Sequence, residues 1–549
     1  MTLRVHPHIE VPAETARIAR AAFPKGNPYL SLRDELGSLY DDRDFARLFS
    51  ELGQPGVAPS QLATVTVLQY AEGLTDRQAA DAVRSRIDWK YLMGLELTDA
   101  GFDYSILSEF RERLIESEQV EYLLTSLLEQ FKTKGLLKGG GRQRTDGTHV
   151  LAAIRQLNRL ECVGETLRQA LNEVAMVAPD WLKAQVTPDW FDRYGQRLDS
   201  YRLPSKETER AALREQIGRD GQQMLTAVYS DSAPPEVRDL LAVELLRQVW
   251  LQQYYVQADQ IKWRDKDNLP PQHVLIQSPY DPQARNRTKR QLNWTGYIAH
   301  FTETCDLDSP NLITHVETTP ATTADIHLTP RIHAALAQQE VLPAEHLVDT
   351  AYVDAGQILT SHTDYGLDLV GPVPPDPSWQ ARADQGFAVA CFQIDWDNQT
   401  VTCPQGQPST GWYPRQDGRG NAVIEVSFHR ATCLACPCRL LCTKSVSQPR
   451  MIHFRPQAEH DMLQTARQRQ QTTAFKQLYK KRAGIEGTLS QATRSFELRQ
   501  ARYIGLAKTH LQHVATAVAM NLTRLANWFA EIPKAQTRRS RFAALAPMT

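Results

Sequence analysis

Helical periodicity dominates the chain from about residue 31 to residue 136. Apolar residues recur every three or four positions, which places them on one face of a helix. The first stripe consists of Ala63, Val67, Tyr70 and Leu74, the second of Ala79, Val83 and Ile87, and the third of Ile106, Phe110 and Leu114. Thr75 and Gln78 have the spacing of a capping box at the start of the second helix. Residues 1–30 lack this periodicity and are expected to form an extended arm.

Short helices joined by tight turns, with exposed cations, are typical of a helix-turn-helix-like DNA-binding domain. The cations expected on this surface are Arg84, Arg86, Lys90, Arg111 and Arg113. A helical bundle that only packs or dimerises fits the pattern equally well.

Strand-like patterns follow a glycine turn at residues 139–141. Residues 144–151, 294–302 and 311–318 have the composition of strands, and residues 324–339 have helical spacing. A short apolar segment then ends at Asp349. Strands, a helix and a further strand in this order are expected of an α/β protein with a ribonuclease-H-like core.

Two long stretches separate the parts of this core and are expected to be insertions. Residues 155–262 are helical and charged, and the stretch after Asp349 contains most of the cysteines. The expected organisation is an N-terminal arm at 1–30, a helical domain at 31–138, core segments at 142–155 and 266–372, a helical insertion at 156–265, a cysteine-bearing insertion at 373–460, a C-terminal helical part of the core at 461–535 and a basic tail at 536–549.

Three isolated carboxylates are the candidate chemical groups. Asp146 lies in the first strand-like run, and Asp349 follows the short apolar segment. Glu486 belongs to Tyr479-Lys-Lys-Arg482-Ala-Gly-Ile-Glu486, where a helix would place Tyr479, Arg482 and Glu486 on one face. The cations around Glu486 that are candidates for phosphate contacts are Lys480, Lys481, Arg494, Arg499 and Arg502.

Carboxylate oxygens are hard ligands that suit Mg²⁺ or Mn²⁺. Two such ions roughly 4 Å apart can stabilise both the attacking and the leaving oxygen of a phosphoryl transfer. Taken singly, each aspartate is more often a cap or a turn residue, and Glu486 would simply pair with Arg482 on a solvated basic helix. Taken together, the three contexts favour a metal site formed by Asp146, Asp349 and Glu486.

A second metal site is expected in the cysteine-bearing insertion. Its thiols have the spacing Cys-x29-Cys-x2-Cys-x5-Cys, which suits a tetrahedral structural Zn²⁺ site. The candidate ligands are Cys403, Cys433, Cys436 and Cys442. Cys438 is spare, and His429 is the substitute for the remote Cys403. A redox Cys-x2-Cys pair and plain packing remain the alternatives.

The block from Tyr479 to Glu486 resembles the Tyr-x2-Arg-x3-Glu motif of the DDE transposases of bacterial insertion sequences. Asp349-Thr-Ala-Tyr352 resembles their Asp-x-(Gly/Ala)-(Tyr/Phe) motif. The segments at 101–114, 157–167 and 502–513 resemble the large subfamily that has a helical N-terminal domain and a cysteine-bearing insert, so the similarity runs from about residue 30 to about residue 545. Thr493 stands where the motif often has Lys, and Gly147 where the family usually has Ser or Thr.

The resemblance implies a DNA transposase that binds the ends of an insertion sequence and catalyses metal-dependent strand cleavage and strand transfer. In this interpretation Asp146 bridges two Mg²⁺ (or Mn²⁺) ions, and Asp349 and Glu486 each complete one site. Arg482 orients Glu486 or holds the scissile phosphate, and Tyr479 contacts the DNA backbone. The implied partners are double-stranded DNA, as terminal inverted repeats and target, and a second copy of the chain in a homodimer. The alternatives are a catalytically silent DNA-binding regulator and a metal-dependent nuclease without strand transfer.

Composition changes this interpretation in one respect. The formal net charge is −1 over 549 residues, so local basic surfaces, rather than the chain as a whole, must attract DNA. The first ten residues lack the apolar core of a secretion signal, and no uncharged apolar run approaches the ~18 residues of a membrane span. A cytoplasmic, nucleoid-associated protein without membrane contact is expected.

Overall fold

The structure is a computed structural model that describes residue 3 and residues 10–50, 53–54, 56–383, 385–418, 420–534 and 545. The predicted basic tail at 536–549 lies outside the described residues, except for Leu545, as do most of the first nine residues of the predicted arm. No helix in the described part of the chain combines the length and the apolar character needed to cross a bilayer.

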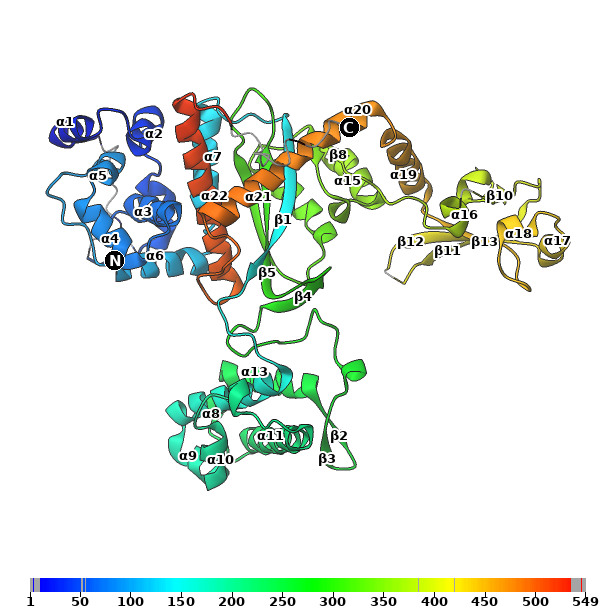
Figure 1. The fold of residues 1–549 in the computed structure, drawn as a ribbon, viewed down its shortest axis with the longest axis horizontal. Helices are drawn as coiled ribbons and strands as arrows, with labels where there is room; N and C mark the ends of the chain where they lie inside the picture. Colours follow the sequence, from blue (N-terminus) through cyan, green and yellow to red (C-terminus); the bar gives the residue numbers. More distant parts are fainter. Residues whose placement is uncertain are drawn as a thin grey trace.

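A six-stranded mixed sheet lies at the centre of the molecule (Figure 1). Its strands are β1 (Arg142–Leu151), β4 (Arg285–Lys289), β5 (Leu292–Thr304), β6 (Ile313–Pro320), β7 (Glu345–Leu347) and β8 (Asp368–Val370). β5 is antiparallel to β1 on one side and to β4 and β6 on the other, whereas β1, β7 and β8 are parallel neighbours. The strands expected at 144–151, 294–302 and 311–318 fall on β1, β5 and β6, which confirms the mixed α/β class.

The N-terminal helices form the block at one end of the molecule (Figure 1). They are α1 (Ala13–Ala22), α2 (Pro28–Leu36), the 3-10 helix η1 (Asp42–Leu48), α3 (Pro59–Glu72), α4 (Asp76–Ser85), α5 (Ile87–Met93), α6 (Ser105–Glu116) and α7 (Tyr122–Thr133). The capping box of Thr75 and Gln78 is present at the start of α4. Ile87 does not continue the α4 stripe, because α4 ends at Ser85 and Ile87 begins α5.

The expectation of an extended arm at residues 1–30 is wrong for its described part. Residues 13–22 form α1, and α2 begins at Pro28. The buried face of α1 consists of Thr15 and Ala19. Thr15 donates a hydrogen bond to the carbonyl of Leu95, and Ala19 packs in a cluster with Tyr91 of α5. Such small side chains leave no apolar stripe in the sequence, so the pattern did not indicate a helix.

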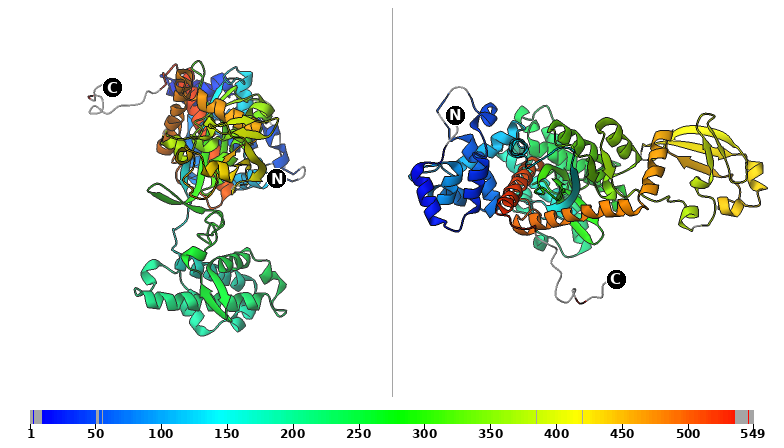
Figure 2. Two further views of the ribbon diagram at one scale, coloured as in Figure 1. Left: turned by 90° about the vertical axis from the view of Figure 1, so that its right-hand side faces the viewer. Right: turned by 90° about the horizontal axis from the view of Figure 1, so that it is seen from above.

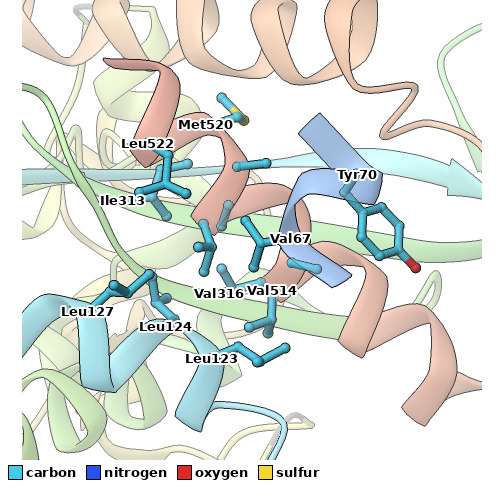
Figure 3. Packing of buried hydrophobic residues seen from close by; sticks show 14 of the residues in the cluster. Val67, Tyr70, Leu123, Leu124, Leu127, Ile313, Val316, Val514, Met520 and Leu522 are labelled. Carbon is cyan, nitrogen blue, oxygen red and sulfur yellow. The ribbon is translucent and has the colours of Figure 1, made fainter. Parts of the chain in front are cut away.

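The N-terminal helices share one buried core with the sheet. α22 (Leu506–Phe529) lies between β6 on one side and α3 and α7 on the other. Figure 3 shows Val514 and Leu522 of α22 near Ile313 and Val316 of β6, with Leu124 of α7 close by. Residues 511–522 of α22 are buried on every side, more than the single predicted stripe required. The helical block is therefore fixed to the sheet by packing.

The predicted helical insertion is a separate unit beside the sheet (Figures 1 and 2). It contains α8 (Arg159–Val177), α9 (Pro179–Gln185), α10 (Pro188–Tyr194), η2 (Ser200–Arg202), α11 (Glu207–Val228), α12 (Pro235–Arg238), α13 (Leu241–Gln253) and the hairpin β2 (Tyr254–Gln257) and β3 (Gln260–Trp263), which precedes η3 (Lys266–Asn268). Its buried residues form their own core. The hairpin replaces the helix expected up to residue 262, because its aromatic and β-branched residues favour strands.

The second insertion and the N-terminal helices lie at opposite ends of the molecule, with the sheet between them (Figure 2, right). After η4 (Asp325–His327), α14 (Thr329–Gln338), η5 (Thr350–Tyr352) and α15 (Ala355–Tyr365), it comprises α16 (Trp379–Arg382), η6 (Val389–Cys391), β9 (Gln393–Asp395), β10 (Thr400–Thr402), β11 (Ser409–Gln416), β12 (Ala422–Phe428), α17 (Arg430–Leu434), α18 (Arg439–Cys442) and β13 (Met451–Phe454). A small core of its own holds it together. The chain returns to the sheet through α19 (Gln457–Arg469), α20 (Thr473–Lys480), η7 (Lys481–Ala483) and α21 (Gly484–Ser495).

Candidate active site

Asp146 and Asp349 are brought together by strand register. β1 and β7 run parallel and pair from Arg142 with Glu345 to Arg144 with Leu347. Continuing this register by two residues on each strand sets Asp146 opposite Asp349. β7 has ended by then, and the Asp349 carboxylate accepts a hydrogen bond from the Thr350 amide at the start of η5. Both carboxylates therefore lie inside the sheet's strand order, beside the C-terminal end of β7.

Arg482 connects the two aspartates. Its Nη2 lies 2.7 Å from Asp146 Oδ2 and 3.9 Å from Asp349 Oδ2. The expectation that Arg482 orients Glu486 or holds the scissile phosphate stays a prediction. No ion pair joins Arg482 to Glu486 among the described residues. The reason is local: η7 interrupts the helix between Tyr479 and Glu486, and the guanidinium turns towards the sheet.

Glu486 lies on the first turn of α21 and is solvent-exposed. Its carboxylate forms no hydrogen bond or ion pair with any residue that the structure describes. Over the same described part of the chain, no three His, Cys, Asp or Glu side chains converge closely enough to hold a metal ion as they stand. The structure thus brings together two members of the predicted triad and leaves the third nearby with a free carboxylate.

The charges of this site influence one another. The pKa of Asp146 is raised, chiefly by burial and further by the negative charge of Asp349, while Arg482 opposes this shift. The pKa of the Tyr479 hydroxyl is also raised by burial, with smaller contributions from Asp349, Asp146 and Glu486. Arg482 opposes this shift, and Tyr479 stays protonated near neutral pH within electrostatic range of all three predicted carboxylates.

The tyrosine of the Asp349–Tyr352 motif contacts β1 indirectly, through His300 of β5. Tyr352 is buried, and its hydroxyl lies 2.6 Å from His300 Nδ1 on β5. The His300 ring abuts Gly147, where a Cβ atom would come within 2.6 Å of Nδ1. The absence of a side chain at Gly147, the residue after Asp146, is what lets this ring fit.

α21 is anchored to the sheet by a buried ion-pair network. Glu303 of β5 is fully buried and lies 2.7 Å from both Arg144 of β1 and Arg524 of α22. Thr488 of α21 donates to the same carboxylate at 2.6 Å. Arg144 also donates to the carbonyl of Lys481 at 2.6 Å, passing so close to Gly484 that a Cβ there would overlap it. This network fixes the start of α21, and with it Glu486, relative to Asp146.

Sequence reasoning missed a fourth carboxylate. Asp325 of η4 is partly buried, and its pKa is raised by burial and further by the charges of Asp146 and Asp349, which Arg287 and Lys289 on β4 oppose. These residues lie in stretches without a motif, so only the folded arrangement reveals them. Two other acids close in sequence to the motifs have structural roles: Asp354 caps α15, and Glu497 pairs with Arg502.

The five predicted phosphate contacts fall into two groups. Lys480, Lys481 and Arg494 form no salt bridge with any described residue, and Lys480 and Arg494 are exposed. Arg499 is exposed but donates to Thr148 of β1. Arg502 is half-buried, with its guanidinium 5.1 Å from the Tyr70 ring centroid and 3.7 Å from Glu497.

The exposure expected of the N-terminal cations is confirmed for Arg84 and is wrong for Lys90 and Arg111. Lys90 and Arg111 are buried; Lys90 donates to backbone carbonyls, and Arg111 lies 2.6 Å from Asp76. The remaining three, Arg84, Arg86 and Arg113, each pair with a nearby carboxylate. Long cationic side chains can satisfy loop carbonyls and acids inside a bundle, and sequence periodicity does not distinguish this from exposure.

The predicted zinc ligands line one cavity of about 170 Å³ in the second insertion. Cys403, Cys433, Cys436 and Cys442 all contribute to its wall, as do Cys438 and His429. The pKa of Cys442 is raised to about 11, mainly by burial, with Cys433, Cys403 and Cys436 adding to the shift while Arg450 opposes it. Three of the predicted thiols thus lie close enough to act electrostatically on the fourth, and zinc binding stays a prediction.

Comparison with known proteins identifies two segments. Residues 402–526 match the family described as "Transposase DDE domain", and residues 18–113 match the family described as "Transposase domain (DUF772)". The first match contains the four predicted zinc ligands, Tyr479, Arg482 and Glu486, whereas Asp146 and Asp349 lie outside both matches. No curated protein and no solved structure matches the chain.

Proposed function

Because the chain belongs to the DDE transposases of insertion sequences, we propose that it binds the ends of such an element and cuts and joins DNA through Asp146, Asp349 and Glu486. The observation that carries the proposal is the register of two parallel strands, which sets Asp146 opposite Asp349 beside the segment that carries Arg482 and Glu486. A ribonuclease-H-like core is part of the proposal. The strand order β6-β5-β1-β7-β8, with three antiparallel and then two parallel strands, supports it.

The residues present fit a divalent cation. Asp146 Oδ2 and Asp349 Oδ2 both lie within 4 Å of a single cationic nitrogen, so the position between them accepts positive charge. Their hard oxygens, with that of Glu486, are the donors that Mg²⁺ or Mn²⁺ prefers. Bound ions would supply charge stabilisation to the attacking and leaving oxygens of the scissile phosphodiester.

The other side chains provide binding and orientation. The protonated Tyr479 hydroxyl is suited to donate a hydrogen bond to a phosphate oxygen. Arg482 offers a guanidinium fork that matches phosphate geometry. Lys480, Lys481 and Arg494, which have no salt-bridge partner among the described residues, would attract the DNA backbone at the same surface. Two copies of the chain would hold the paired ends.

Zinc in the second insertion is the remaining part of the proposal. Burial, with a further contribution from the neighbouring thiols, raises the pKa of Cys442 and disfavours its thiolate form unless a cation is present. A Zn²⁺ ion bound by Cys403, Cys433, Cys436 and Cys442 would stabilise the thiolates and join the ends of the insertion's short elements.

The test of the triad is isosteric replacement. Asp146→Asn, Asp349→Asn and Glu486→Gln should each reduce Mg²⁺-dependent cleavage of end DNA by roughly a thousandfold or more, because metal ligands contribute several kcal/mol to the transition state. End binding should persist, since other residues contact the phosphates. Asp354→Asn is the matched control, because Asn caps α15 as well as Asp does.

Full cleavage by any of the three variants removes that residue from the proposal. Wild-type protein that binds ends without cutting them would favour the silent regulator. Cutting without joining to a target would favour a nuclease without strand transfer.

A further inference from the structure

Arg482 lies where a cation between the two aspartates would bind. A single nitrogen, Nη2, is 2.7 Å from Asp146 and 3.9 Å from Asp349. Among the described residues no other cation forms an ion pair with either carboxylate. The Arg482 side chain is 13% exposed and Asp146 is 21% exposed, so water screens the contact with Asp146 only weakly, whereas Asp349 is 46% exposed.

The carboxylate pair needs such a partner. Two neighbouring carboxylates repel each other, and burial adds a desolvation cost at Asp146. Arg482 acts against both effects at Asp146. In the absence of metal, the guanidinium therefore bridges the two aspartates and offsets their mutual repulsion.

The same position excludes a metal ion. Mg²⁺ takes oxygen ligands at about 2.0–2.1 Å, and a guanidinium bonded to the same oxygen would oppose it by charge and by space. The guanidinium of Arg482 is also incompletely hydrogen-bonded in this position, since its Nε is buried without a hydrogen-bond partner. Arg144 and Arg524 nearby, in contrast, donate several bonds into the Glu303 network.

We propose that Arg482 is a displaceable counter-ion, which holds Asp146 and Asp349 together until a divalent cation takes its place and then becomes free to bind a phosphodiester. The inference rests on the proposed metal site. The two equilibria are linked: the Arg482 contact weakens metal binding by the same factor by which bound metal weakens the Arg482 contact. The metal would thereby create a phosphate-binding group at the site where the phosphate is needed.

The test measures Mn²⁺ affinity of the full chain without DNA, by calorimetry or electron paramagnetic resonance. Arg482→Gln should bind Mn²⁺ roughly tenfold more tightly than wild type, because an adjacent opposite charge typically changes ionic equilibria by one or more powers of ten. Lys476→Ala, which removes a charge from exposed α20 without touching the aspartates, should leave the affinity unchanged. Asp146→Asn should abolish the site.

A second measurement uses the wild-type protein and does not depend on how the variant folds. Mg²⁺ should accelerate modification of Arg482 by phenylglyoxal, followed by mass spectrometry, because the released guanidinium becomes accessible. Equal or weaker Mn²⁺ binding by Arg482→Gln, an equal gain in Lys476→Ala, or no change in modification rate overturns the inference alone. Absence of any Mn²⁺ binding that depends on Asp146 overturns the proposed metal site as well.

Discussion

Gly147 is the residue whose role the sequence left least explained. The family usually has Ser or Thr at this position, and the hydroxyl is not a ligand. The structure supplies a steric reason for glycine: a Cβ would lie 2.6 Å from His300 Nδ1 and 3.1 Å from Ile298 Cγ2. His300 cannot easily move, because it is buried and both of its ring nitrogens form hydrogen bonds, one with Tyr352 and one with Thr319.

Gly147→Ala is therefore expected to destabilise the protein by about 1–3 kcal/mol, the usual cost of overpacking a well-filled core. Thermal or urea unfolding measures this. Gly487→Ala is the control: it lies on α21 next to Glu486, has nothing within 4 Å of the added Cβ, and should be neutral or slightly stabilising. Equal stability of both variants would mean that the His300 ring has room to shift.

Sequence pattern identified single residues where chemistry and local spacing sufficed. Asp146 and Asp349 stood out because each was an isolated acid beside apolar residues, and the structure sets them in one strand register. The partner of Arg482 could not be predicted, because an ion pair between residues more than 300 positions apart depends on the packing of η7 against the sheet. Asp325 was missed for the same reason.

The elements with strong periodicity were predicted well. α4, α6 and the strands β1, β5 and β6 follow their hydrophobic patterns, since each buries one face or both. α1 and the β2–β3 hairpin were not anticipated, because their burial uses small or aromatic residues without a regular stripe. The 3-10 turn η7 also escaped prediction; the Glu303 network that holds the following helix is entirely tertiary.

The helices α20, η7 and α21 carry a basic face, formed by Lys480, Lys481 and Arg494, that is expected to bind DNA phosphates. Lys481 has no salt-bridge partner among the described residues, whereas Arg502 is tied to Tyr70 and Glu497. Lys481→Ala should lower the slope of log affinity against log salt by about 0.9, the value for one phosphate contact. Arg502→Ala should leave the slope unchanged and instead lower the melting temperature, because it loses packing against α3.

Affinity for end DNA across a salt series, with melting curves of the same samples, separates the two effects. A reduced slope for Arg502→Ala and an unchanged slope for Lys481→Ala would reverse the assignment. In that case the phosphates would bind nearer the junction with the N-terminal helices than the centre of α20 and α21.

The whole molecule consists of one large core and two satellite cores. The sheet, the N-terminal helices and α22 share the first, and each insertion has its own. The existence of two insertions was predictable, because the chain between the carboxylates is far longer than the strands require. Their directions were not, since these depend on linkers and contacts that leave no periodic signal (Figure 2).

Separate cores make a specific prediction about zinc. The second insertion has few buried apolar residues, so a metal bound by its four cysteines should contribute much of its stability. Purified protein should hold about one Zn²⁺ per chain in this site. Removing it with a strong chelator should expose the amides of β11–β13 to hydrogen exchange while those of β1, β5 and β6, in the large core, stay protected.

Cysteine variants test the same point without a chelator. Cys436→Ser should lose zinc and the protection of β11–β13, because serine does not replace a thiolate ligand. Cys391→Ser is the matched control, since Cys391 is exposed, belongs to the same insertion and lies outside the cavity wall. If both variants carry the same zinc as wild type, or if wild-type protein is soluble, protected and free of zinc, the cysteines only pack. If instead the protection of β1 and β5 is lost together with that of β11–β13, the insertion is part of the main folding unit, and its separate core does not unfold independently.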